Sequence, residues 1–319
     1  MISVVLPVRN SPKLTADCLD ALGFSLEQFT RDDVEILLID DDSDPDCQII
    51  EIFKLFKDFS PFPTKIIKLN QRHHFLGACN YGLYFSRGDF ILIVSNDMLI
   101  TPSYIHTLVK VMSADAKIGI LRGLMSYADG FPDLSVSPPL PVRDYEDIIL
   151  FSDYVARYYQ NSARNVSYVG FDSVLIRREV IDAIGILDPS YFGYFGEIDY
   201  GLRCELSGFS LQVALGAWLY HLGSGHIHYE ISATGIDRAT ALKERTQLVN
   251  SAYQVFHSKW HLHRLGLPFS WYELLKGQTE VNPDLSKMID FARVKEQGNL
   301  DLFVDPKQIN LDACQIIDS

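Results

Sequence analysis

The first third of the chain alternates between short apolar segments and longer segments with helical periodicity. Four apolar runs rich in Val, Ile and Leu stand at Ile2–Val8, Val34–Asp40, Lys65–Leu69 and Phe90–Val94. Helical patterns lie between them at Lys13–Leu22, Cys47–Phe59 and Ala78–Ser86. Short runs with few polar residues are typical of strands buried on both faces of a parallel sheet. The alternation therefore predicts an α/β fold with a doubly wound, mainly parallel sheet and helices on both faces.

The second half of the chain is less regular. A proline-rich loop is expected over Tyr127–Arg143. Beyond it the pattern predicts helices at Asp144–Asn161, Arg178–Ile184 and Glu197–Ser207, and strands at Tyr168–Ile176 and Leu211–Tyr220. A longer helix is expected over Arg238–Trp260, with one apolar stripe at Leu242, Val249, Tyr253, Phe256 and Trp260. We therefore divide the chain into an α/β domain of residues 1–230 and a mostly helical extension of residues 231–319, which packs on the domain and ends in an extended acidic arm.

Composition and charge exclude several classes of protein. Of the 319 residues, 47% are hydrophobic and 22% charged, so the chain can form a substantial core and is not mainly disordered. A net charge of −13 argues against nucleic acid as a partner. The five cysteines are scattered, without a C-x-x-C motif, and predict reduced thiols. No apolar run is long enough to span a membrane, and Met1–Pro7 is typical of a strand rather than a signal peptide, so we expect a cytoplasmic protein.

Polar residues follow three of the four apolar runs. Arg9 and Asn10 follow the first, Asp40–Asp44 close the second, and Ser95–Asp97 follow the fourth. Asp, Asn and Ser are good turn formers, so a turn alone would explain any one of these groups. Ligands of doubly wound sheets bind at the carboxyl ends of the strands. Acids after two central strands therefore indicate a binding site at that edge.

Several sequence blocks, taken together, resemble family 2 of the glycosyltransferases, which have the GT-A fold. The blocks are VVLPVRN at Val4–Asn10, LLIDDDSD at Leu37–Asp44, ACNYGLYFSRGDFILIVSND at Ala78–Asp97, GFDSVLIRREVIDAIGILDPSYFGYFGEIDYGLRCELSGF at Gly170–Phe209 and WLYHLGSGH at Trp218–His226. Their order and spacing carry the resemblance, which covers roughly residues 1–226. The rhamnosyltransferase-like members are the most similar.

The resemblance implies a divalent cation, Mn²⁺ or Mg²⁺, beside the diphosphate of a nucleotide-sugar donor. In the family a D-x-D motif holds this cation, and the matching residues here are Ser95, Asn96 and Asp97. Asp97 thus matches the metal-binding acid, whereas Ser95 replaces the first one. His221 matches a histidine that completes the metal or phosphate site, and carboxylate and imidazole are both reasonable ligands for Mn²⁺. The alternative is that Asn96 and Asp97 form a turn and that His221 is structural.

Other matched positions imply the nucleotide site. Asp40 matches the acid that contacts a pyrimidine, because a carboxylate can accept the imide N–H of uracil or thymine. The first loop over the nucleotide is matched by Pro7, Val8, Arg9 and Asn10. Asn80 matches an asparagine near the start of a helix. Cys79 stands where many members have a phosphate-binding arginine, so one expected contact is missing.

The acceptor side of the resemblance depends on Glu197 and Asp199. The family pattern is E-D-x-D followed four residues later by Arg, and counting back from Arg203 places Asp199 on the last acid and Glu197 on the catalytic one. Gly196 stands where the family usually has Glu. A base must take the proton of the acceptor hydroxyl, and a carboxylate at a helix N-terminus is expected to stay ionised. Glu197 is the preferred candidate; the alternative for Asp199 is an i,i+4 pair with Arg203.

These matches imply an inverting, metal-assisted glycosyltransferase with a UDP- or dTDP-linked donor. Its acceptor would be a saccharide or a lipid-linked hydroxyl, the latter placing the enzyme at the inner face of the membrane. A sugar nucleotidyltransferase would need a glycine-rich phosphate loop after the first strand, and PVRNSPK has no glycine. A second alternative is a degenerate GT-A domain that only binds a sugar nucleotide or a partner. Slow hydrolysis of the donor with Mn²⁺ would distinguish an enzyme from such a binder.

Overall fold

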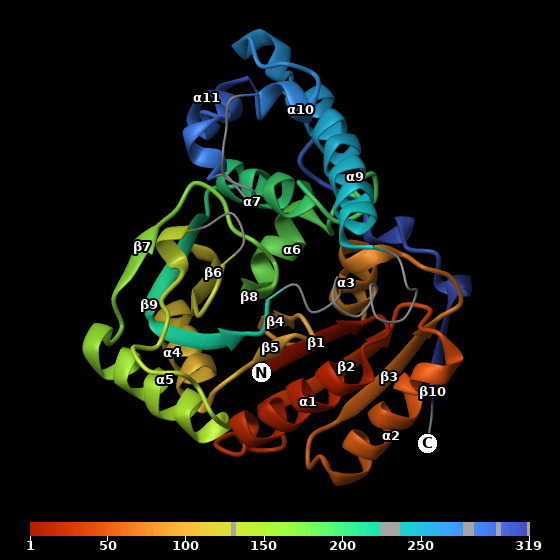
Figure 1. The fold of residues 1–319 in the computed structure, drawn as a ribbon, viewed down its shortest axis with the longest axis vertical. Helices are drawn as coiled ribbons and strands as arrows, with labels where there is room; N and C mark the ends of the chain where they lie inside the picture. The colour runs from red at the N-terminus through yellow and green to blue at the C-terminus, as the bar shows by residue number, and fades with distance from the viewer. Residues whose placement is uncertain (129–131, 224–236, 277–283, 298–300, 318–319) are drawn as a thin grey trace.

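The computed structural model describes residues 1–319 except 129–131, 224–236, 277–283, 298–300 and 318–319 (Figure 1). The strands are β1 (Ile2–Val8), β2 (Val34–Asp40), β3 (Thr64–Leu69), β4 (Phe90–Val94), β5 (Met98–Leu99), β6 (Ile118–Met125), β7 (Ala163–Asn165), β8 (Ser173–Arg177), β9 (Ser210–His221) and β10 (Cys314–Ile317). The helices are α1 (Pro12–Leu26), α2 (Ile49–Phe59), α3 (His74–Phe85), α4 (Pro102–Ala114), α5 (Tyr145–Tyr159), α6 (Arg178–Ile184), α7 (Gly196–Leu206), α9 (Arg238–Lys259), α10 (Trp271–Leu274) and α11 (Phe291–Glu296).

One mixed sheet organises the described part of the chain, in the order β10-β3-β2-β1-β4-β8-β6-β9-β5, with β7 beside β9. The neighbours β3, β2, β1 and β4 are parallel, as are β6 and β9. β8 lies antiparallel between β4 and β6. The sheet is therefore α/β and mainly parallel in its first half, as the alternation of strands and helices predicts.

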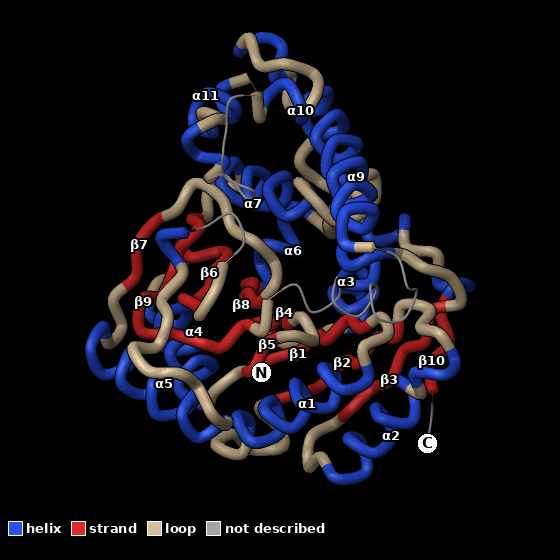
Figure 2. The backbone as a smooth tube through the Cα atoms, in the orientation of Figure 1, coloured by secondary structure: helices blue, strands red, loops and turns tan. Residues whose placement is uncertain are grey.

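Two apolar layers lie on the two faces of the sheet. Alternate residues of β1 show this, because Val5 packs in one cluster with residues of α3, α6, α7 and α9, whereas Val4 and Leu6 pack in the other with residues of α1, α2, α4 and α5. Figure 2 shows the helices on both sides of the strands. Burial on both faces explains why these strands are continuous apolar runs rather than alternating ones.

The apolar runs predict β1, β2 and β4 with their observed bounds, and β3 begins one residue earlier than expected. The strand expected from Tyr168 begins only at Ser173. β6 was not predicted, since its sequence IGILRGLM contains two glycines and an arginine. Gly119 and Gly123 lie too close to their neighbours for a side chain, because a Cβ would approach Cys204 and Tyr104 to 2.6 and 2.4 Å.

The C-terminal segment is helical at first and then returns to the sheet. Tyr253, Phe256 and Trp260 of the expected stripe are fully buried, whereas Leu242 is 36% exposed. The last strand, β10, pairs antiparallel with β3 at the edge of the sheet, although an extended arm was expected there. The expected domain boundary at residue 230 lies outside the described residues. None of the helices in the described ranges is long and apolar enough to cross a membrane.

Candidate active site

The sheet brings the predicted nucleotide and metal residues to one edge. β1, β2 and β4 run parallel, so Arg9, Asp40 and Ser95 stand at or just beyond the same ends of these strands. The short strand β5 then pairs with the end of β9, with Met98 opposite His221. This pairing brings His221 beside Asp97, although more than a hundred residues separate them in sequence.

Asp97 and His221 form a buried pair. Nε2 of His221 lies 3.3 Å from Oδ2 of Asp97, and Nδ1 lies 2.7 Å from the carbonyl oxygen of Tyr127. Since a carbonyl can only accept, Nδ1 carries a proton. Burial lowers the pKa of His221, but the hydrogen bond and charge of Asp97, with the charge of Asp172, outweigh it and raise this pKa to about 9.

This donor set fits a hard divalent cation that takes most of its ligands from elsewhere. A carboxylate oxygen and an imidazole nitrogen face each other, and both suit Mn²⁺ once Nε2 has lost its proton. Among the described residues, no group of three His, Cys, Asp or Glu side chains could hold a metal ion. A cation bound here would therefore need phosphate and water oxygens to complete its coordination. The turn interpretation also fits, because the carbonyl of Ser95 accepts from the N–H of Met98.

Asp172 is a site residue that the sequence analysis missed. Its backbone carbonyl accepts from the N–H of Ser95 at 2.7 Å, which ties it to the loop of Asp97. Its carboxylate pairs at 3.2 Å with Arg122, which is fully buried on β6. The negative charge of Asp172 raises the pKa of both His221 and Glu197. The sequence contained one signal for this pair, because Arg122 and Asp172 are each the charged residue of a mainly apolar segment.

Glu197 stands in the first turn of α7; the residue is half-buried, and one oxygen of its carboxyl group is turned into the protein. Among the described residues, its Oε2 is buried and has no hydrogen-bond partner. Burial raises the pKa of Glu197 to about 8, against the lowering effect of its own backbone N–H and with a further increase from Asp172. The expectation that the helix N-terminus keeps this group ionised is therefore wrong, because desolvation outweighs the backbone N–H.

The chain has no room for the acid that the resembled family usually carries before Glu197. A Cβ on Gly196 would lie 2.4 Å from Cδ1 of Leu76 and 2.9 Å from Cβ of Tyr191. Phe195, just before it, has a φ of +64°. Close packing of the helix start against Leu76 and Tyr191 thus excludes a side chain at position 196.

Asp199 lies in the interior and is not placed to remove a substrate proton. Its side chain is fully buried, and its Oδ2 accepts from Nε of Arg203 at 2.8 Å. Its Oδ1 accepts from the indole N–H of Trp260 at 2.9 Å and pairs with Lys259 at 2.7 Å. Because both oxygens are occupied by protein groups, these contacts favour the ion pair with Arg203 over a catalytic role for Asp199. The choice between Glu197 and Asp199 as the base stays a prediction.

The loop after β1 is hydrogen-bonded to the loop after β2. Arg9 donates to the carbonyl oxygens of Asp41 and Asp42, and the side-chain oxygen of Asn10 accepts from the N–H of Asp44. Pro7 and Val8 are buried strand residues at the end of β1. The amide of Asn96 donates to the hydroxyl of Thr15 at 3.0 Å. These hydrogen bonds within the protein fix the conformation of the loop after β1.

Asn80 has a structural partner at both ends of its amide. Its Nδ2 donates to the carbonyl of Leu187, and its Oδ1 accepts from the N–H of the same residue, both at 2.9 Å. The side chain is buried and ties α3 to the segment that leads to α7. Contact between Asn80 and a nucleotide stays a prediction.

Asp40 and Asp41 are both buried at the end of β2. Asp40 lines a cavity of about 270 Å³ together with Lys68 and with Gln315 of β10. Asp41, which sequence analysis treats as a turn residue, accepts from the backbone N–H of His73 at 2.6 Å. Burial raises the pKa of both carboxyl groups. Both acids thus lie beside the predicted nucleotide loop, and contact of either with a base stays a prediction.

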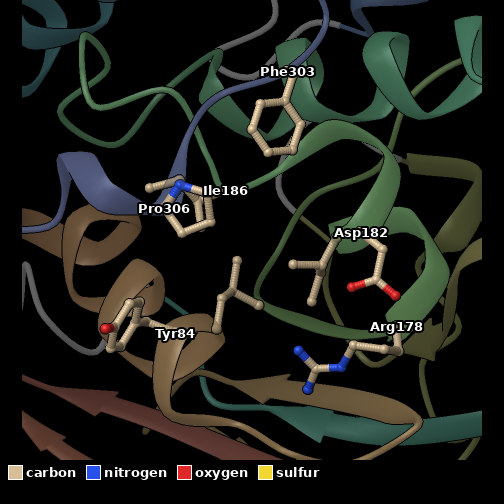
Figure 3. Close-up of a pocket in the computed structure, with 8 residues that line it drawn as sticks. Tyr84, Arg178, Asp182, Ile186, Phe303 and Pro306 are labelled. Carbon is tan, nitrogen blue, oxygen red and sulfur yellow. The ribbon is translucent and has the colours of Figure 1, made fainter.

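A larger cavity, of about 420 Å³, lies away from these residues. Figure 3 shows Tyr84 of α3, Arg178 and Asp182 of α6, and Phe303 and Pro306 of the C-terminal segment around it. Arg178 follows β8, and the end of β8 pairs with the start of β4. The cavity therefore lies toward the start of β4, whereas Asp97 follows its end. It contains none of the predicted site residues.

Comparisons with known proteins show the family of this chain. Residues 3–185 match the model of the family described as Glycosyl transferase family 2. A curated relative, the putative glycosyltransferase EpsH of Bacillus subtilis (strain 168), is 24% identical over 187 residues, which are 57% of this chain and 48% of the relative. The chain thus spans about half the length of that relative.

Solved structures show the same fold. The mannosyltransferase PcManGT from Pyrobaculum calidifontis, in complex with GDP-Man and Mn²⁺, is 12% identical with a TM-score of 0.52, over 93% of this chain and 83% of its own. S. aureus TarS 1-349, in complex with UDP-GlcNAc, is 15% identical with a TM-score of 0.51, over 92% and 81%. These likenesses confirm the GT-A fold.

Proposed function

Because the chain belongs to glycosyl transferase family 2, we propose that it is a glycosyltransferase, which transfers a sugar with inversion from a UDP- or dTDP-linked donor. The acceptor is the hydroxyl group of a saccharide or of a lipid-linked saccharide. The observation that carries this proposal is the buried Oε2 of Glu197, which has no hydrogen-bond partner among the described residues, close enough to Asp172 to feel its charge, which also acts on His221 of the Asp97–His221 pair.

Glu197 is suited to act as the base. In a single displacement the acceptor oxygen forms a bond to the anomeric carbon, the bond from that carbon to the diphosphate breaks, and the acceptor proton passes to Glu197. A carboxylate with a pKa near 8 binds that proton more strongly than an exposed one would. Inversion follows because one displacement reverses the configuration at the anomeric carbon.

Asp97 and His221 would hold a divalent cation, which when bound would offset the negative charge on the departing nucleoside diphosphate. The carboxylate of Asp97 would supply an oxygen ligand and the imidazole of His221 a nitrogen ligand. Arg9, on the neighbouring loop, is half-buried and oriented by the carbonyl oxygens of Asp41 and Asp42. We therefore propose that the guanidinium of Arg9 lies beside the phosphates of the donor.

A panel of sugar nucleotides tests the donor class. Ligands that bind the folded state raise the melting temperature by mass action. UDP- and dTDP-sugars with Mn²⁺ should raise it, and the same compounds with EDTA should not. GDP- and ADP-sugars are the matched controls. A purine-linked sugar that stabilises the protein as strongly as a pyrimidine-linked one would overturn the proposed donor class.

A further inference from the structure

Residues on both sides of Glu197 are held by the C-terminal segment. Phe195 precedes α7 in a left-handed conformation, with φ +64°, and no side chain caps this end of the helix. The ring of Phe195 packs against the rings of Tyr253, Phe256 and Trp271, with centroids 5.4, 5.3 and 5.6 Å away. An unusual backbone conformation persists only where surrounding contacts determine it. The aromatic residues of α9 and α10 provide such contacts.

Asp199, one half-turn after Glu197, is held by the same segment. The indole N–H of Trp260 donates to its Oδ1. The ammonium of Lys259 lies 2.7 Å from that oxygen and 2.6 Å from a carboxylate oxygen of Asp188. Lys259 thereby joins α7 to the segment that precedes it.

Arg203 completes the attachment one turn further along α7. Its guanidinium donates to the carbonyl oxygens of Ile184 and Ile186 in the core, and to that of Leu302 in the C-terminal segment. The core contacts Gly196 through Leu76 and Tyr191 on another side. The first turn of α7 is therefore enclosed jointly by the α/β core and by the C-terminal segment.

We propose that Trp260 is a positioning residue for Glu197, and that the C-terminal segment is a working part of the acceptor side of the site rather than only a cover for apolar surface. The proposal rests on the proposed role of Glu197 as the base. Trp260 is fully buried, so its proposed action is indirect: it fixes the start of α7 through Asp199.

Trp260→Phe tests this proposal, since it keeps an aromatic ring and removes only the N–H donor to Asp199. A shift of about 1 Å in a catalytic group can cost on the order of 100-fold in rate. The kcat for transfer should therefore fall about 10- to 100-fold. The donor KM, and the Kd and stoichiometry of donor binding by calorimetry, should not change, because the nucleotide residues lie on other elements. Lys259→Met should change the same quantities in the same direction.

Tyr168→Phe is the matched control. It removes two other hydrogen bonds between the core and the C-terminal segment, because the Tyr168 hydroxyl donates to Asp284 at 3.1 Å and accepts from the N–H of Leu285 at 3.0 Å. It should lower the melting temperature and leave kcat at the wild-type value. A kcat unchanged in Trp260→Phe, or lowered equally in Tyr168→Phe, would overturn the positioning role. Glu197→Gln in parallel separates the two claims, because wild-type transfer by that variant would refute the base itself and the positioning role with it.

Discussion

Trp260 and Asp199 are 61 residues apart in sequence and share a hydrogen bond of 2.9 Å in the protein interior. The carboxylate of Asp199 thereby joins two parts of the chain, since it also pairs with Arg203 on its own helix. An ion pair with no exposed surface differs from a pair on a solvated helix. Breaking it by removing one charge leaves the other charge buried and uncompensated.

Asp199→Asn should therefore destabilise the protein strongly, by about 3 kcal/mol or more in the free energy of unfolding. Asp17→Asn is the control, because Asp17 forms an i,i+4 pair with Lys13 at 2.6 Å on the exposed face of α1. Its loss should cost about 0.5 kcal/mol at most. Denaturant titration measures both values. Similar small losses for the two variants would contradict the structural role given to Asp199.

Glu197→Gln should stabilise the folded protein in a pH-dependent way. In the folded wild-type protein, burial raises the pKa of Glu197 from 4.5, the ordinary value, to about 8. The stability that the protonated group contributes is therefore complete below pH 4.5 and is lost as the pH rises toward 8. The free energy of unfolding of Glu197→Gln should therefore exceed that of the wild-type protein by an amount that grows between pH 4.5 and pH 8. This difference should reach a few kcal/mol and stay constant at higher pH. Thermal unfolding at pH 5 and pH 8.5 measures it, and a difference independent of pH would show that the carboxyl group is not enclosed.

Asp97→Ala should abolish the metal dependence of donor binding. In the wild-type protein, calorimetry should detect UDP or dTDP with Mn²⁺ and not with EDTA, if Asp97 and His221 supply the protein ligands as proposed. Asp42→Ala removes a carboxylate from the same edge of the sheet and should keep the dependence. Equal affinity of the wild-type protein with Mn²⁺ and with EDTA would refute the proposed cation site.

The choice of nucleobase should depend on an acid at the end of β2. If Asp40 accepts the imide N–H of a pyrimidine, Asp40→Ala should reduce the ratio of the Kd values for GDP and UDP by about 10- to 100-fold, the usual contribution of one hydrogen bond to a charged group. Asp41→Ala should be measured in parallel, because Asp41 is equally buried and its backbone carbonyl contacts Arg9. A narrowed difference only in Asp41→Ala would move the base contact to that residue, and no change in either would refute the pyrimidine contact.

Sequence patterns predicted those parts of the fold that depend on local periodicity. The continuous apolar runs that form β1, β2 and β4 are a direct consequence of burial on both faces of the sheet. The helix expected over Glu197–Ser207 is observed as α7, Gly196–Leu206. The polar strand ends placed Asp97 and Asp40 at one edge, because parallel strands end together.

Features that depend on contacts distant in sequence could not be predicted. The strand β10 is recruited to β3 from more than two hundred residues away, and no local pattern marks CQII as its partner. The pairing of Arg122 with Asp172 needs β6 and β8 to be neighbours. Enclosure of Glu197 also comes from tertiary packing, which is why its pKa moved opposite to the direction that a helix N-terminus predicts.

The most direct test of the central claim compares transfer by the wild-type protein and by Glu197→Gln, with a donor identified by the melting-temperature panel and with Mn²⁺ present. Glu179→Gln, an exposed position on α6, is the control. The account predicts that the kcat for transfer falls by roughly 10²- to 10⁴-fold in Glu197→Gln, with an unchanged donor Kd and with wild-type transfer in the control. Wild-type transfer by Glu197→Gln would contradict the account, because another group would then have to accept the proton.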